Sequence, residues 1–88
     1  MRPVSLDFPK EDEEIHGGTC TFLVTTHPAA AEVELSVNQG PWQPCVPDEG
    51  CWFFGSTGLA PGRHLARARM RTRDGCVMTT LPRRFRVV

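Results

Sequence analysis

The fold is decided by residues 64–73, which read His64-Leu65-Ala66-Arg67-Ala68-Arg69-Met70-Arg71-Thr72-Arg73. Small or apolar side chains alternate in this stretch with arginines, and a period of two is typical of a strand with one buried face. The pattern predicts a strand that buries Ala66, Ala68 and Met70. The arginines between them then point outward in a row, about 6.6–6.8 Å apart. They are Arg67, Arg69, Arg71 and Arg73.

Similar alternation recurs along the chain between frequent glycines and prolines, of which there are eight each. It predicts six strands, at residues 4–8, 18–26, 32–37, 51–57, 64–73 and 76–88. Asp74-Gly75 predicts a two-residue type I′ turn that makes the last two strands a hairpin. The 88 residues suffice for one domain only. Because short strands alternate with turns and long helical segments are missing, the expected fold is all-β. It is a single antiparallel β-sandwich of six to seven strands spanning residues 1–88.

Several further stretches resemble immunoglobulin-like and fibronectin type III-like domains of the kind found as bacterial accessory modules. They are residues 37–42 (Val-Asn-Gln-Gly-Pro-Trp), Trp52, Phe54, residues 58–64 (Gly-Leu-Ala-Pro-Gly-Arg-His) and Asp74-Gly75. The resemblance implies the sandwich fold and leaves the function open, because this fold has many unrelated uses. It also implies a structural role for His64, whose ring is expected to bond a backbone carbonyl at the corner before its strand.

The neutral total charge hides an uneven distribution. Residues 1–50 carry two basic and nine acidic side chains, whereas residues 51–88 carry eight arginines and one acidic side chain. With ten positive and ten negative side chains overall, no net field directs the chain to nucleic acid or an acidic membrane. Residues 10–14, one lysine followed by four acidic residues, form a charge-dense segment, called the acidic segment below. It is expected to be a mobile surface loop, because it can bury nothing.

The outward arginines are the strongest candidate for a contact surface. On the last strand, inward Phe85 and Val87 imply that Arg84 and Arg86 point outward beside the arginines of the preceding strand. The candidate binding residues are therefore Arg67, Arg69, Arg71, Arg84 and Arg86. The resemblance implies that residues 32–37 form the strand beside residues 64–73. One interpretation is therefore a solvated face whose charge is balanced by Glu32 and Glu34. The other is an anion-binding face, because two glutamates leave most of these arginines unneutralised.

An alternative contact surface uses exposed aromatic side chains. Trp42 follows a Gly-Pro turn, and Phe53 points away from the core if Trp52 and Phe54 point into it. Trp42 and Phe53 together would then form a platform on which a sugar ring stacks. The other interpretation is that Trp42 lies over an edge of the sandwich as a lid.

The cysteines and histidines indicate neither a metal site nor a catalytic site. Cys45 and Cys51 flank a turn and form a possible disulfide under oxidising conditions. Paired Cys-x-x-Cys motifs are missing, and the three histidines fall in separate segments, so no metal is expected. No motif combines a nucleophile, a base and an orienting group. We expect no enzyme activity and no cofactor.

These observations predict a non-catalytic interaction or accessory module that contacts an unidentified protein or anionic ligand through its arginine-rich sheet. A carbohydrate-binding module and a purely structural spacer domain are the alternatives. The first residues lack the apolar segment of a secretion signal, which predicts a cytoplasmic location. A surface or periplasmic location is expected instead if the chain is part of a longer protein. No apolar run is long enough to span a membrane.

Overall fold

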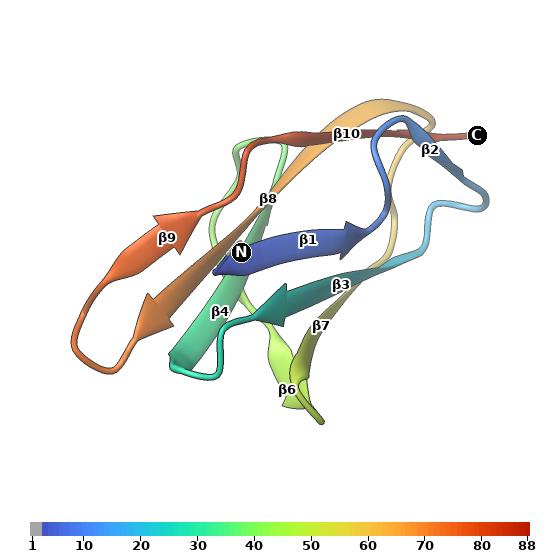
Figure 1. Ribbon diagram of the computed structural model, residues 1–88. Coiled ribbons are helices and arrows are strands. Elements are labelled where there is room, and N and C mark those ends of the chain that lie inside the picture. The colour runs from blue at the N-terminus through green and yellow to red at the C-terminus, as the bar shows by residue number, and fades with distance from the viewer. Residues whose placement is uncertain (1–2) are drawn as a thin grey trace.

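Two β-sheets stacked on one another make up the computed structural model, which describes residues 3–88 (Figure 1). Sheet A has the order β1-β3-β7-β6, with strands β1 (Val4–Phe8), β3 (Cys20–Thr26), β7 (Cys51–Ser56) and β6 (Val46–Asp48). Sheet B has the order β2-β10-β8-β4-β5, with strands β2 (Glu13–Ile15), β10 (Arg83–Val87), β8 (Gly62–Thr72), β4 (Ala30–Val37) and β5 (Gln43–Pro44). A further strand of sheet B, β9 (Val77–Thr79), pairs with β8.

The core lies between the sheets and takes alternate side chains from both. Ala66, Ala68 and Met70 of β8 are buried, as the sequence predicts. Phe22 of β3 is fully buried and packs edge-on against Phe85 of β10, with ring centroids 5.7 Å apart. The strand pairs are antiparallel except for β2 with β10, which run parallel. The predicted all-β sandwich is therefore confirmed.

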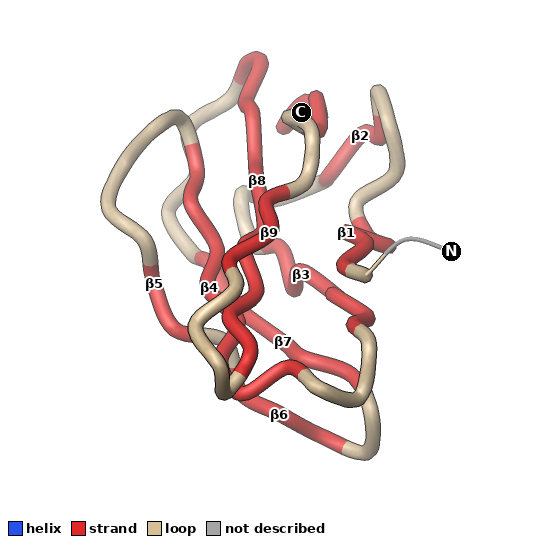
Figure 2. Tube along the Cα trace, turned by 60° about the vertical axis from the view of Figure 1, so that its left-hand side comes forward, coloured by secondary structure: helices blue, strands red, loops and turns tan. Residues whose placement is uncertain are grey.

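Three short strands were not predicted. β5 and β6 follow β4 in the chain, and Figure 2 shows β5 beside β4 and β6 beside β7. β2 lies within and just after the acidic segment, where the sequence predicts a mobile loop. That prediction is wrong for the end of the segment, because Glu13–Ile15 pairs with β10 and Ile15 is buried.

The last predicted strand is divided into β9 and β10, which both pair with β8. The turn before β9 also differs from the predicted type I′ form, which needs positive φ at both central residues. Gly75 has φ of 92°, but Asp74 is not among the residues with positive φ. The N–H of Gly75 donates to the carbonyl of Thr72, and the N–H of Thr72 donates to the carbonyl of Cys76. The loop therefore has three residues, 73–75, and Arg73 lies in it rather than in the strand.

The part of the chain that the structure describes contains no helix long and apolar enough to cross a membrane.

Candidate functional site

The outward side of β8 carries the candidate arginines. Because the buried residues of β8 alternate with its arginines, Arg67, Arg69 and Arg71 project from the face of sheet B that points away from sheet A. Two of the three are half-buried by neighbouring side chains, and Arg71 is exposed. The placement on one ridge agrees with the expectation from sequence.

Strand β4 supplies the nearest carboxylates, in register with these arginines. Glu34 lies opposite Arg69, and both Nε and Nη2 of Arg69 donate to Oε1 of Glu34, at 3.1 and 2.6 Å. Glu32 lies opposite Arg71 in the same way, but these two side chains form no ion pair. Within residues 3–88, the glutamates of β4 therefore neutralise one arginine of this row, Arg69.

Trp42 lies on the same face and covers two of the arginines. The guanidinium carbon of Arg69 is 4.2 Å from a ring centroid of Trp42, and that of Arg67 is 5.4 Å away. Such cation–π contacts contribute about 0.5–1 kcal/mol each at exposed sites and restrict the guanidinium groups. Trp42 thus lies over the arginine row on the outer face of sheet B, rather than over an edge of the sandwich as the second interpretation had it.

Phe53 does not join Trp42 in a platform. It lies on β7 in sheet A, between Leu23 of β3 and Val46 of β6. Trp52 and Phe54, its neighbours in β7, pack against the core, so Phe53 points away from it. Trp42 and Phe53 consequently lie on the outer faces of opposite sheets, and the proposed sugar platform is not formed.

The arginines of β10 have neighbours that the sequence did not suggest. In register, Arg84 lies opposite Leu65 and Arg86 lies opposite Arg63, so neither is beside Arg67, Arg69 or Arg71. The residues across from Arg69 and Arg71 on the other flank of β8 are instead Thr79 and Val77 of β9. The candidate arginines therefore form two groups, one on β8 and one on β10.

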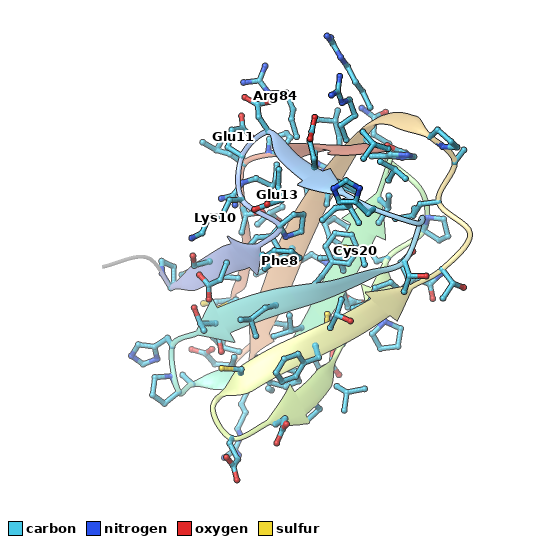
Figure 3. The ribbon with its side chains drawn as sticks, turned by 90° about the vertical axis from the view of Figure 1, so that its right-hand side faces the viewer. Phe8, Lys10, Glu11, Glu13, Cys20 and Arg84 are labelled. Carbon is cyan, nitrogen blue, oxygen red and sulfur yellow. The ribbon has the colours of Figure 1, made fainter. Side chains whose placement is uncertain are left out.

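Carboxylates from the acidic segment pair with the β10 group. Glu11 accepts hydrogen bonds from the backbone N–H, Nε and Nη2 of Arg84, at 2.9, 3.0 and 2.8 Å (Figure 3). The Arg84 backbone N–H, and after it the guanidinium, hold the pKa of Glu11 below its ordinary value. Glu14 pairs with Arg86, its neighbour across β2 and β10. Sequence reasoning missed these pairs because they depend on where β2 docks.

Four arginines have no ion pair with any carboxylate in residues 3–88, and they are Arg63, Arg67, Arg71 and Arg73. Three of them belong to β8, and Arg73 follows β8 in the turn. Arg63 also lines a groove of about 700 Å³ with Arg84 and Arg86, but Asp12 and Glu14 line the same groove. The unneutralised positive charge therefore follows β8 and its turn.

His64 has the structural role that the resemblance implies. Its Nε2 is 2.7 Å from the carbonyl oxygen of Ala60, and its ring stacks on Phe85 at a centroid distance of 5.4 Å. The N–H of Leu65 donates to Oδ1 of Asn38, which leaves Nδ2 of Asn38 to donate to Nδ1 of His64 at 2.8 Å. These contacts fix the orientation of the ring between Asn38 and the carbonyl of Ala60.

The possible disulfide between Cys45 and Cys51 is not present, since both residues are free cysteines. In the β6–β7 pairing Cys51 lies opposite Asp48, three residues along the strand from Cys45. That offset corresponds to about 10 Å, which exceeds the Cα separation of a disulfide.

Burial raises the pKa of the thiols of Cys20 and Cys45 to about 11, so both are weak nucleophiles. Within residues 3–88, no three His, Cys, Asp or Glu side chains are grouped as a metal site would need.

Comparison with known proteins identifies the class of fold. No protein-family model and no curated protein sequence matches the chain. A fibronectin(III)-like module of CbhA from Clostridium thermocellum matches with a TM-score of 0.80 at 20% identity, over 96% of this chain and 93% of that one. CopC from Methylosinus trichosporium OB3b matches with a TM-score of 0.67 at 12% identity, over 90% of this chain and 85% of that one.

An engineered protein also matches, with a TM-score of 0.77 at 14% identity, over 97% of this chain and 20% of that one. At such identities the likeness shows the fold alone. The chain has a fibronectin type III-like β-sandwich fold, as its resemblance to such domains implied.

Proposed function

We propose that the chain is a non-catalytic binding module whose β8 arginines contact an acidic surface of a partner protein. One observation carries this proposal: Arg63, Arg67 and Arg71 project from a single strand and form no ion pair with the carboxylates of residues 3–88. A neighbouring acidic surface would neutralise them at no cost to an existing ion pair. The small fibronectin type III-like fold is consistent with an accessory role.

The geometry of the arginine row suits carboxylates. Guanidinium groups bind carboxylates through two parallel hydrogen bonds, and Trp42 holds the group of Arg67 in place before a partner arrives. Restricting a side chain in advance lowers the entropy cost of binding. The sugar-platform alternative has no such support, because Phe53 lies on the other sheet and Arg69 covers the ring of Trp42.

The test measures the binding of a synthetic peptide rich in Asp and Glu. Tryptophan fluorescence is the signal, because Trp42 lies within the proposed site. We expect Arg67→Ser/Arg71→Ser to weaken binding about tenfold, since two lost contacts of about 0.7 kcal/mol each give that factor. Binding to the unchanged protein should also weaken as salt is raised.

The control is Arg84→Ser/Arg86→Ser, which removes the same charge from the β10 group. Those arginines already have carboxylate partners, so their loss should weaken peptide binding less than the β8 changes. Equal losses in the two double variants would mean that net charge alone attracts the peptide, and would refute a β8 site. No binding by the unchanged protein would also refute it.

We further propose that the module works in a reducing compartment such as the cytoplasm. All four cysteines are free, and Cys76 is exposed. Mass spectrometry of the protein isolated from cells with its thiols blocked should find four modified cysteines. Disulfide-linked cysteines in that sample would contradict this location.

A further inference from the structure

Strand β9 has an open edge with unpaired backbone groups. It pairs with β8 on one side only, and its other side has no strand partner within residues 3–88. Figure 1 shows β9 running beside β8 at the border of sheet B. Exposed apolar side chains accompany it: Val77 is 47% exposed, Met78 40%, and Leu81 just beyond the strand 86%.

The hydrogen-bonding pattern shows which backbone groups face this edge. Thr72 donates its N–H to the carbonyl of Cys76, and Thr80 donates to the carbonyl of Ala68. Hydrogen-bonded pairs alternate along an antiparallel ladder, so Met70 and Met78, midway between these two pairs, form the next one. The N–H and C=O groups of Val77 and Thr79 therefore point away from β8, towards the open edge.

The other border strands have features that discourage pairing with another chain. β1 contains Asp7 and an irregularity in register between Leu6 and Phe8. β2 has three residues, two of which are glutamates, and β5 and β6 contain Pro44 and Pro47. Charges, prolines, bulges and short length are the usual means of protecting an edge. β9 has three residues, as β2 has, but it contains no charged residue, no proline and no bulge.

We propose that β9 pairs with β9 of a second copy of this chain, antiparallel and about a two-fold axis at Met78. This pairing sets Val77 opposite the second copy's Thr79 and Thr79 opposite its Val77. Each is a hydrogen-bonded pair, so the N–H and C=O groups of both residues are satisfied in both copies. The arrangement is self-complementary, as a symmetric dimer requires. This proposal does not depend on the one made for the arginines.

The surroundings of β9 suit a second copy. No charged side chain lies on either β9, so no like charges meet across the axis. The two β8 strands would be three strand spacings apart, about 14 Å, and their arginines would be largely screened from one another. A groove of about 530 Å³ between β1 and β9, lined by Leu6, Met78 and Leu81 among others, leaves room beside β9. With so short an edge the dimer should be weak, because its interface is below the standard size.

The test is sedimentation velocity over protein concentrations from about 10 µM to about 1 mM, because a weak dimer is populated only at high concentration. We expect the average mass to rise from 9.8 kDa towards twice that value. Amide hydrogen exchange should report the same event: the N–H groups of Val77 and Thr79 should become protected as the concentration rises.

Two pairs of variants distinguish pairing of the β9 edges from nonspecific association. Thr79→Pro removes an N–H that the edge exposes and β8 does not use, so it should abolish the dimer, whereas Thr79→Val keeps the N–H and should dimerise. Met78→Lys sets two ammonium groups opposite one another at the axis and should also give a monomer, with Met78→Leu as its control. Thermal unfolding shows whether each variant is folded. If Thr79→Pro does not fold, Met78→Lys decides the matter.

A monomer at every concentration would overturn the proposal, and so would a dimer that persists in the folded Thr79→Pro or Met78→Lys variant. Loss of the dimer in both control variants would overturn it as well, because those keep the backbone groups of the edge.

Discussion

The arginines of β8 and those of β10 lie on the same face of sheet B, yet they differ in what surrounds them. Arg84 and Arg86 of β10 each pair with a glutamate of the acidic segment. Among the β8 arginines, Arg69 alone forms an ion pair with a carboxylate of residues 3–88, and that carboxylate belongs to Glu34 of β4. The number of arginines on a surface is therefore a poor measure of the positive charge available to a partner, because some of them are already neutralised within the chain.

The difference follows from the strands on either side. β10 borders β2, which brings Glu14 opposite Arg86 and lets Glu11 reach Arg84. Arg69 and Arg71 of β8 lie between β4 and β9, and the β9 residues opposite them, Thr79 and Val77, are uncharged. Within residues 3–88, the carboxylates next to these two arginines come from β4, and one ion pair forms there, between Arg69 and Glu34.

The largest expected effect comes from removing the core that supports both groups. Phe85 lies between Arg84 and Arg86 on β10, is 2% exposed, and contacts Phe22 and His64. Phe85→Ala should lower the free energy of unfolding by about 3–5 kcal/mol, since it opens a cavity under the sheet. Urea unfolding at neutral pH measures this loss. If Phe85→Ala lowers the urea midpoint no more than an ordinary surface substitution does, the ring of Phe85 does not anchor β10.

A smaller effect, dependent on pH, is expected where Glu11 is replaced. The pKa of Glu11 is below its ordinary value of 4.5 in the folded protein, so the unfolded chain binds this proton more readily. The contribution of Glu11 to stability is therefore complete well above pH 4.5 and is lost as the pH falls through its lowered folded pKa. Glu11→Gln should unfold at lower urea than the unchanged protein at neutral pH, and the gap should close in acid.

Glu32→Gln is the matched control for this variant, because Glu32 is also a surface carboxylate but has no ion pair with Arg71. It should change the urea midpoint less than Glu11→Gln does at neutral pH. A gap between Glu11→Gln and the unchanged protein that stays constant into acid would contradict the assigned role of the Glu11 carboxylate.

The sequence predicts the β8 row well because its information is local. Alternation along residues 64–73 is enough to assign Ala66, Ala68 and Met70 to the core and the arginines to the surface, and the structure agrees. Residues 32–37 are predicted in the same way, so the carboxylates of β4 are placed on the correct face.

The β10 group could not be predicted in this way. β2 has three residues, too few to show a period, and it reaches β10 by a parallel pairing that spans most of the chain. The break at residues 80–82 also displaces Arg84 and Arg86 along the sheet, where they face Leu65 and Arg63 rather than the other arginines. The position of Trp42 over Arg69 likewise depends on the path of a loop and not on any local pattern.

Within the β8 row, the paired and the unpaired arginines should differ in stability measurements. Arg69 and Glu34 are half-buried and share two hydrogen bonds. A double-mutant cycle with Arg69→Ser and Glu34→Gln should give a coupling of about 0.5–1 kcal/mol, the upper range for such pairs. Urea unfolding of the four proteins provides the cycle. A coupling of zero would show that the ion pair adds nothing to sheet B.

The smallest effect on the free energy of unfolding is expected for replacement of Arg71. Salt should act on it in the opposite sense to its action on the Arg69–Glu34 ion pair, because salt weakens attraction in that pair and repulsion at Arg71. Arg71 forms no ion pair with a carboxylate of residues 3–88. It lies two residues from Arg69 in the strand and two residues from Arg73 in the turn, so like charges flank it along the chain. Arg71→Ser should change the free energy of unfolding by less than about 0.5 kcal/mol. If it has any effect at low salt, it should stabilise the protein by relieving repulsion, and added salt should remove that gain. A clear loss of stability at low salt would mean that Arg71 has a partner within the chain, and it would then be no more available for binding than the arginines of β10.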